Sequence, residues 1–216
     1  MLPVGGRPLV EHTIRQLVAH GVKEIGMNLH QNPSAVMQHF GDGEQFAVRI
    51  QYSIEPEPTG TAGALRAFRR MLGDAPFFVI YGDNLTTCDF DALARAHAQF
   101  GGTSTVALFW RDDVTKHSAV AVERDMRISR FIEKPRADEA PSHWISAGMM
   151  VLQPEVFGYI PAEGVCDIGY DLFPALLGAG ESVYGYYMRE SEGLWWIDTP
   201  EDYARISRLC EKGFPP

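Results

Sequence analysis

Cysteine and lysine are scarce in this 216-residue sequence. Its three cysteines, Cys88, Cys166 and Cys210, are an odd number at wide spacing, a pattern that gives neither a disulfide framework nor a zinc site. We therefore expect reduced thiols in a cytoplasmic protein. Lysine supplies only four of the 19 basic residues, so a lysine that stands inside a motif is informative.

A surplus of basic charge and a long apolar run are also missing. The net charge of −9 argues against a nucleic-acid partner, which would need a basic face. The same charge repels phosphate, so a phosphate-bearing ligand needs a few placed cations or a metal ion. No apolar run approaches the ~20 residues that span a membrane, and we expect no membrane partner. The length predicts a single domain, residues 1–216, and no pattern indicates its oligomeric state.

Two common nucleotide-binding signatures are absent. Gly60 to Gly63 is not followed by the Gly-Lys-Ser/Thr of a phosphate-cradling P-loop. The chain also lacks Gly-x-Gly-x-x-Gly, which argues against a nicotinamide dehydrogenase.

The apolar run from Phe77 to Tyr81 predicts a strand that is buried on both faces, as in a parallel sheet covered by helices. The turn signal Gly82-Asp83-Asn84 then leaves a carboxylate just past the carboxyl end of this strand. Ligands of open α/β sheets bind at that edge. Taken alone, however, an aspartate after a strand is more often a turn residue.

Strand and helix patterns alternate along the first half of the chain. The expected helices follow Pro8 and Pro33 and cover 60–72 and 89–100, and the expected strands cover 24–30, 47–53 and 77–81. The second half adds strands at 103–110, 119–123, 128–133, 144–152, 182–189 and 194–197, and helices at 154–160, 169–178 and 200–211. We predict an α/β, Rossmann-like fold: a mainly parallel sheet flanked by helices, with antiparallel strands added in the second half.

Three segments outside the Asp83 turn could carry chemistry. Glu55 leads into Gly60-Thr61-Ala62-Gly63, whose small residues would let a ligand approach a helix amino terminus, although a packed loop explains them equally well. Glu133-Lys134-Pro135 ends a strand and could bridge sugar hydroxyls and a phosphate, whereas an edge-strand ion pair is the commoner explanation. Ser146-Ala147-Gly148 begins a buried strand and could serve packing alone.

Asp198 stands where a predicted strand leads into the last helix. It could be simply the residue at the amino terminus of that helix. Two carboxylates at strand ends, Asp83 and Asp198, could alternatively share a magnesium ion, which takes oxygen ligands and substrate phosphates.

Six motifs in order resemble the sugar-1-phosphate nucleotidyltransferases, also called nucleotide-sugar pyrophosphorylases. They are Gly5-Gly6-Arg7-Pro8-Leu9, Gly60-Thr61-Ala62-Gly63, Gly82-Asp83-Asn84, Glu133-Lys134-Pro135, Ala147-Gly148 and Asp198-Thr199-Pro200-Glu201-Asp202-Tyr203. The resemblance covers nearly the whole chain. It is closer to the mannose-1-phosphate guanylyltransferases than to the thymidylyltransferase branch.

The resemblance implies that an oxygen of a sugar 1-phosphate attacks the α-phosphorus of a nucleoside triphosphate and that pyrophosphate leaves. It implies catalytic roles for Asp83, Asp198 and Lys134, with Mg²⁺ held by the two aspartates. The implied nucleotide-binding residues are Glu55, Gly60, Thr61, Ala62, Gly63 and Gly82. The implied sugar-phosphate-binding residues are Glu133, Lys134, Ser146, Ala147 and Gly148.

The chain departs from the family pattern in three places. The family's first strand and its Gly-x-Gly-Thr-Arg loop, which brings cations to the triphosphate, are expected ahead of Met1 and are absent; we expect a truncated start. The family's Tyr-Gly is His117-Ser118 here, and its Asn-Ala-Gly is Ser146-Ala147-Gly148.

Two other functions stay open. A non-catalytic nucleotide-sugar-binding or regulatory subunit would suit the missing cationic loop. A glycosyltransferase that consumes nucleotide-sugars would favour a paired Asp-x-Asp, whereas Asp83 is followed by Asn84 and Leu85.

Overall fold

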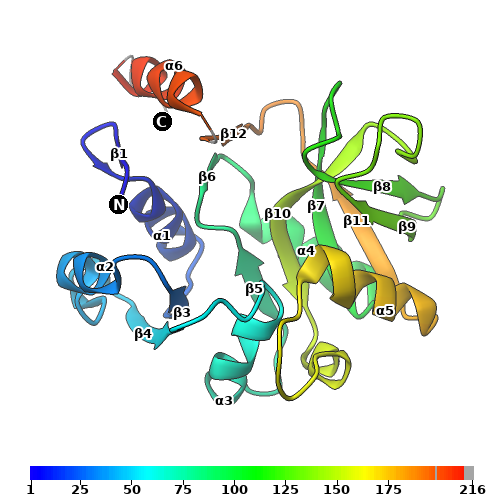
Figure 1. Ribbon diagram of the computed structural model, residues 1–216, viewed down its shortest axis with the longest axis horizontal. Helices are drawn as coiled ribbons and strands as arrows, with labels where there is room; N and C mark the ends of the chain where they lie inside the picture. The colour runs from blue at the N-terminus through cyan, green and yellow to red at the C-terminus, as the bar shows by residue number, and fades with distance from the viewer. Residues whose placement is uncertain (198, 212–216) are drawn as a thin grey trace. The chain divides into compact units, whose positions relative to one another are not determined.

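The computed structural model describes residues 1–197 and 199–211 (Figure 1). The chain divides into two compact units. The first comprises Met1–Ile54, Tyr81–Phe90 and Arg189–Pro216, and the second comprises Glu55–Ile80 and Asp91–Met188. The first unit therefore gathers segments that are far apart in the sequence.

The first unit contains short strands and four helical segments. In chain order they are β1 (Pro3–Val4), β2 (Arg7–Pro8), α1 (Leu9–Ala19), β3 (Glu24–Leu29), α2 (Pro33–Phe40), the 3₁₀ turn η1 (Glu44–Phe46), β4 (Arg49–Ile54), β6 (Asn84–Thr86), β12 (Leu194–Trp196) and α6 (Pro200–Glu211).

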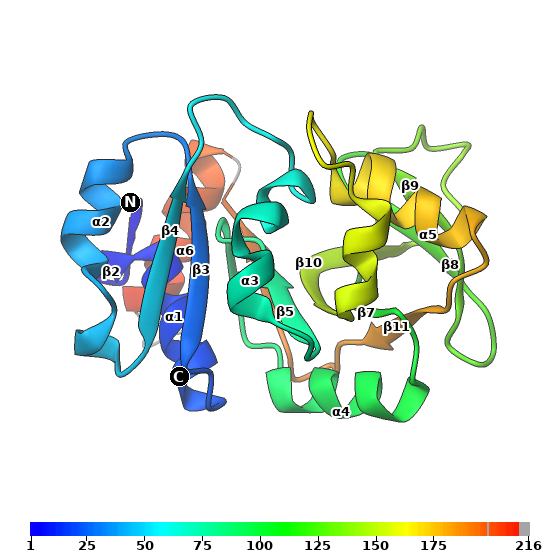
Figure 2. The same ribbon diagram turned by 90° about the horizontal axis from the view of Figure 1, so that it is seen from below.

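One core of this unit lies between the helices α1 and α2 and the parallel ladder of β3 and β4, which Figure 2 shows side by side. Apolar residues of α1 recur at helical spacing, and Val10, Ile14 and Val18 belong to this core. The buried residues of this core are Ile14, Phe40, Phe46, Val48 and Ile50.

A second core of the first unit joins the two ends of the chain. Val4, Leu9 and Leu85 pack with Ile206 of α6. Next to them, β6 pairs antiparallel with β12, with Trp196 opposite Asn84. We expected a turn at Asn84 and not a strand. Among the described strands, β6 pairs with β12, which lies more than a hundred residues later in the chain.

The second unit holds the larger sheet. Its elements are η2 (Gly63–Phe68, a 3₁₀ helix), α3 (Arg69–Leu72), β5 (Phe77–Ile80), α4 (Phe90–Phe100, whose first residue belongs to the other unit), β7 (Ser104–Trp110), β8 (Ser118–Val122), β9 (Ile128–Glu133), β10 (Trp144–Leu152), η3 (Pro154–Tyr159, also 3₁₀), the π-helical turn η4 (Ile168–Leu172), α5 (Phe173–Gly178) and β11 (Val183–Tyr187).

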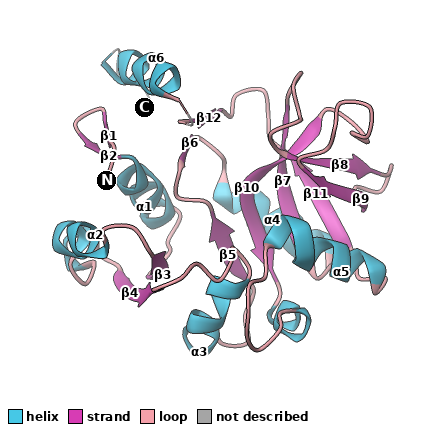
Figure 3. Cartoon of the chain, in the orientation of Figure 1, coloured by secondary structure: helices cyan, strands magenta, loops and turns pink. Residues whose placement is uncertain are grey.

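The strands of this sheet run in the order β11-β7-β10-β8-β9, with β5 also paired to β10. Helices and strands are distinguished by colour in Figure 3. Helix α4 contacts β11 through the Phe100 ring, which stacks on Tyr184 at 4.9 Å between centroids, and contacts β7 through His97 and Thr105. Helix α5 packs on β9 through the stacked rings of Phe131 and Phe173, 4.6 Å apart. The predicted α/β class with helices flanking the sheet is thus confirmed.

Strand pairing is more mixed than the expected mainly parallel sheet. Among the described strands, β3–β4 and β7–β11 are parallel ladders, whereas β10 runs antiparallel to β5, β7 and β8. The apolar run of Phe77–Ile80 forms a strand as predicted, but only Phe77 is buried and the other three residues are half-buried. An apolar run also carries no information about the direction of the neighbouring strands.

Several predicted helices differ in detail. The segment 60–72 is not one helix: it forms a turn, then η2 and α3. The segments 154–160 and 169–178 begin as a 3₁₀ helix and as a π-helical turn respectively. Asn32 precedes α2 in a left-handed conformation (φ 48°), and its side chain makes no capping hydrogen bond.

Cys88, Cys166 and Cys210 are free thiols. None of the helices in the described part of the chain combines the length and the apolar character needed to cross a membrane.

A buried histidine links α4 to the sheet. His97 is only 3% exposed, and its Nδ1 lies 3.0 Å from the Thr105 hydroxyl while its Nε2 lies 2.9 Å from the Gln153 amide nitrogen. Because an amide nitrogen can only donate, Nε2 accepts, and the ring is neutral. Burial accordingly lowers the pKa of His97.

This histidine makes the fold sensitive to acid. The pKa of His97 is lower in the folded than in the unfolded chain, so the unfolded chain binds the proton first as the pH falls below about 6.5. We expect the free energy of unfolding to fall between pH 7.5 and 5.5, with a contribution from His97 of up to about 1.4 kcal/mol per pH unit. Urea denaturation of the wild type and of His97→Gln measures this contribution as the difference between their pH slopes.

A matched control is His143→Gln, because His143 is exposed. This control should keep the wild-type slope. Equal slopes in the wild type and in His97→Gln would contradict the assignment to His97.

Candidate functional site

The loop from Gly60 to Gly63 is held by the backbone of Cys166. The Cys166 carbonyl oxygen accepts from the amides of Ala62 (3.0 Å) and Gly63 (2.8 Å), and the Cys166 amide donates to the Thr59 oxygen (2.9 Å). A Cβ on Gly60, whose φ is +82°, would lie 2.3 Å from the Cys166 oxygen. The glycine is therefore required both by its conformation and by this close approach.

Glu55 shapes the same loop from the other side. Its carboxylate is 9% exposed and accepts from the Thr59 amide (3.2 Å) and from the Thr59 hydroxyl (3.1 Å). The described contacts of Glu55 thus close the turn ahead of Gly60. A contact of this residue with a nucleobase stays a prediction.

Thr61 connects the loop to a carboxylate that sequence reasoning missed. Its hydroxyl donates to Asp167 Oδ2 (2.8 Å) and accepts from the Ile168 amide (2.8 Å). Asp167 is the residue that precedes η4, and its Oδ1 accepts from the amides of Gly169 and Tyr170. An aspartate just before a predicted helix is a capping signal, which could have identified the cap but not the partner Thr61.

Burial raises the pKa of the Cys166 thiol, and burial is the largest influence on that pKa. A thiol with a raised pKa stays protonated and is a poor nucleophile or metal ligand. Cys166 therefore contributes to this site through the hydrogen bonds of its backbone.

Glu133 and Lys134 stand at the end of β9. The Glu133 carboxylate accepts from the Ser118 hydroxyl on the neighbouring strand β8. Lys134 is exposed and left-handed (φ 47°), and its amide donates to the His117 oxygen (3.0 Å). A left-handed lysine is strained, and such strain often marks functional positions. No ion pair joins the two side chains within the described residues, so an edge-strand ion pair does not explain the motif.

Ser146, Ala147 and Gly148 form an irregularity in β10. The register against β7 shifts between Ser146 and Met150, and Gly148 has φ +71°. Ala147 is fully buried, and Ser146 is partly exposed. Bulges of this kind are over-represented next to binding sites, because they redirect side chains.

The Gly82–Asn84 turn lies in the first unit, directly before β6. Asp83 is exposed, and a Cβ on Gly82 would lie 3.6 Å from Val10 of α1. Asn84 is 4% exposed, and its Oδ1 has no hydrogen-bond partner in the part of the chain that the structure describes. Asp198, predicted as the second metal ligand, lies outside the described residues.

The second unit therefore brings together two of the predicted segments. Residues 166–169 contact the Gly60–Gly63 loop on one side, and a Cβ on Gly169 would lie 2.3 Å from Glu133 Oε2 on the other. The pairing of Asp83 with Asp198 stays a prediction.

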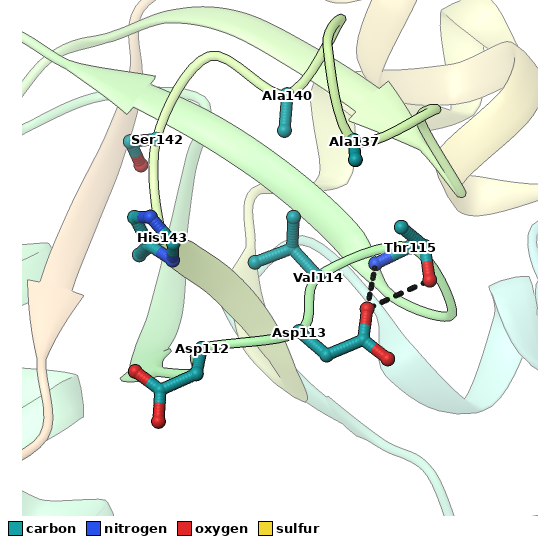
Figure 4. Close-up of a pocket in the computed structure, with 8 residues that line it drawn as sticks. All are labelled: Asp112, Asp113, Val114, Thr115, Ala137, Ala140, Ser142 and His143. Carbon is teal, nitrogen blue, oxygen red and sulfur yellow. Dashed lines mark hydrogen bonds between the residues drawn. The ribbon is translucent and has the colours of Figure 1, made fainter.

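A separate cavity of about 170 Å³ contains none of the predicted site residues (Figure 4). It is lined by Asp112, Asp113, Val114, Thr115, Ala137, Ala140, Ser142 and His143. Hydrogen bonds from Thr115, through its hydroxyl (2.7 Å) and its amide (3.0 Å), lower the pKa of Asp113. This carboxylate serves mainly to close the turn that Figure 4 shows.

The close approach at Gly60 can be tested by comparison with a second glycine. Gly60→Ala should destabilise the fold by about 2–4 kcal/mol, through a left-handed alanine plus the clash with Cys166. Gly180→Ala, with φ +80° and no atom within 4 Å of its Cβ, should cost only about 1 kcal/mol. Urea denaturation measures both losses, and equal losses would show that the contact with Cys166 contributes nothing.

Comparison with known proteins now identifies the family. The family model described as nucleotidyl transferase matches residues 1–212. A mannose-1-phosphate guanyltransferase of Aspergillus fumigatus is 32% identical over 209 residues, which cover 94% of this chain and 56% of that protein. A mannose-1-phosphate guanylyltransferase of Mycobacterium tuberculosis is 29% identical over 219 residues, covering 100% of this chain and 59% of its own length. The chain thus spans little more than half the length of these relatives.

Solved structures share the fold. A Bacillus anthracis protein in complex with a sucrose superposes with a TM-score of 0.85 at 24% identity, over 97% of this chain and 85% of that chain. An apo UDP-glucose pyrophosphorylase superposes with a TM-score of 0.83 at 18% identity, over 99% of this chain and 90% of that chain. The resemblance inferred from the six motifs is confirmed: this chain belongs to the nucleotidyl transferase family.

Proposed function

We propose that the protein transfers a nucleotidyl group from a nucleoside triphosphate to a sugar 1-phosphate, giving a nucleotide-sugar and pyrophosphate. The observation that carries the proposal is the junction in the second unit, where residues 166–169 lie against both the Gly60–Gly63 loop and Glu133. A nucleotide segment and a sugar-phosphate segment are the two parts that this reaction has to hold together. The family model spans both units, so we propose one nucleotidyltransferase domain, residues 1–216.

The chain's own residues act by positioning and by charge. The Gly60–Gly63 loop, with Glu55, would bind the nucleotide. Gly82 lies in the first unit and stays a predicted nucleotide-binding residue. The bulge at Ser146–Gly148 and the carboxylate of Glu133 would bind sugar hydroxyls. Lys134 would place its ammonium group at the phosphate, where a point charge offsets the acidic field of a protein with a net charge of −9. Nucleotidyl transfer requires little covalent work from the protein.

The residues around Asp83 fit a magnesium ion. Asp83 offers exposed carboxylate oxygens, and its neighbour Asn84 has a buried amide oxygen without a partner among the described residues. Asp198 follows Trp196 by two residues, and Trp196 lies opposite Asn84 in the ladder of β6 and β12. When bound, Mg²⁺ neutralises charge on the phosphates.

The sugar and the base are proposed by similarity. Two of the relatives described above are named for mannose 1-phosphate and the guanylyl group. A Synechocystis relative, 29% identical over 92% of this chain and 53% of its own length, is named a UTP–glucose-1-phosphate uridylyltransferase. We favour mannose 1-phosphate and GTP as the first pair to test. A cytoplasmic location is part of the proposal, supported by the three free thiols.

Pyrophosphate release tests the proposal. The protein should release pyrophosphate when incubated with Mg²⁺, a nucleoside triphosphate and a sugar 1-phosphate, in a matrix of common triphosphates and sugars. Asp83→Asn should lower the rate by 10²-fold or more, on the order expected when a metal-holding carboxylate is lost. Tight nucleotide-sugar binding by calorimetry without turnover would instead favour the non-catalytic binding subunit.

A substitution of Lys134 can distinguish an effect on function from an effect on stability. Lys134→Gly removes the ammonium group and also the left-handed strain at φ 47°, which costs of order 1 kcal/mol in a residue other than glycine. We expect a melting temperature equal to or above that of the wild type, together with a rise of at least about tenfold in KM for the sugar 1-phosphate.

The matched control is Lys23→Ala, which removes another exposed lysine and should leave KM unchanged. An unchanged KM in Lys134→Gly would contradict the role of the ammonium group, whatever the melting temperature.

A further inference from the structure

We propose that Asp167 is a positioning residue that couples the nucleotide loop to the sugar-phosphate residue Glu133. This inference rests on the proposed function, and it adds a residue outside all of the motifs that identified the family. We call residues 166–169 the clasp, because they contact the Gly60–Gly63 loop on one side and Glu133 on the other.

The first side of the clasp is a dense set of hydrogen bonds. Cys166 bonds the loop through its backbone, and the Thr61 hydroxyl bridges Asp167 Oδ2 and the Ile168 amide, each at 2.8 Å. Arg66 of η2 holds the segment that precedes the clasp, because it donates to the carbonyl oxygens of Pro161 (2.7 Å) and Gly164 (2.6 Å). These hydrogen bonds hold the loop against the clasp.

Both carboxylate oxygens of Asp167 accept hydrogen bonds in this arrangement. Oδ2 accepts from Thr61, and Oδ1 accepts from the amides of Gly169 (2.8 Å) and Tyr170 (3.1 Å). The Asp167 amide donates to Asp171 Oδ2 (2.7 Å). A carboxylate with such partners is held in one orientation, and it acts on the site through the residues that it holds.

The second side of the clasp meets Glu133. The place of a Cβ on Gly169 lies 2.3 Å from Glu133 Oε2 and 3.0 Å from its Cδ. The glycine thus leaves room for the carboxylate, which also accepts from the Ser118 hydroxyl. Because Asp167 Oδ1 holds the Gly169 amide, a shift of Asp167 moves the surface against which Glu133 rests.

The consequence is a coupling between the two proposed subsites. Thr61 belongs to the nucleotide loop and makes no hydrogen bond to Glu133 in the described part of the chain. A change at Thr61 that breaks its bond to Asp167 should nevertheless weaken binding of the sugar 1-phosphate. A merely structural bond would lower stability and leave that binding unchanged.

The experiment is a double-mutant cycle on turnover. We expect Asp167→Ala and Thr61→Val each to raise KM for both substrates by roughly 3- to 10-fold, the range of one or two hydrogen bonds, with a smaller change in kcat. The double variant should be impaired by less than the product of the two single effects, because both single variants remove the shared bond between Thr61 and Asp167. Thr61→Ser keeps the hydroxyl and should restore both KM values.

The matched control is Asp113→Ala. Asp113 accepts from the hydroxyl and amide of Thr115 in an outer turn, so its loss removes a similar bond outside the clasp. This variant should leave both KM values at the wild-type level. If Asp167→Ala fails to fold, Asp167→Asn keeps one acceptor oxygen and takes its place in the cycle.

The outcomes separate the inference from the proposed function. Turnover in the wild type, with the KM for sugar 1-phosphate unchanged in Thr61→Val and Asp167→Ala, overturns the coupling and leaves the proposed function standing. If the wild type binds GTP and mannose 1-phosphate without turnover, the same variants are compared by their dissociation constants, measured by calorimetry. The expected ratios to the wild type are those given above for KM. If the wild type shows no turnover and no binding, the coupling and the proposed function are both overturned.

Discussion

The carbonyl oxygen of Cys166 is the contact on which the candidate site depends. It accepts from two successive amides, those of Ala62 and Gly63, and so replaces the intrahelical partners that these groups lack at the start of η2. Because this oxygen occupies the space where a Cβ on Gly60 would stand, the loop and the clasp approach at backbone distance. Two segments about a hundred residues apart thereby become one surface.

Two of the predicted segments have an unusual backbone. Lys134 is left-handed at the end of β9, and Gly148 has a positive φ within the irregularity of β10. The conformation of Lys134 costs free energy in a residue other than glycine, whereas Gly148 adopts its conformation without that cost. Both positions lie within motifs that were identified from the sequence.

Prediction from the sequence succeeded for elements whose pattern is local. The amphipathic period of α1 and the apolar run of β5 were recognised because burial leaves a mark in the order of residues. Strand β6 was missed, because its first residue, Asn84, was read as part of a turn and its partner β12 lies far along the chain. Likewise, Glu133 and Thr61 were selected by motif, whereas Asp167 was not, since no local pattern tells which hydroxyl an aspartate will meet.

The sequence by itself determined the α/β class and the family, because residue type and spacing decide local conformation and available chemistry; the residues for phosphate and sugar stay a prediction. The tertiary structure alone decided which strands run antiparallel, that the Gly60–Gly63 loop lies against Cys166, and that Gly169 leaves room for Glu133. The physical reason is that such contacts join segments distant in the chain. Their partners are selected by the packing of the whole core and not by the residues on either side.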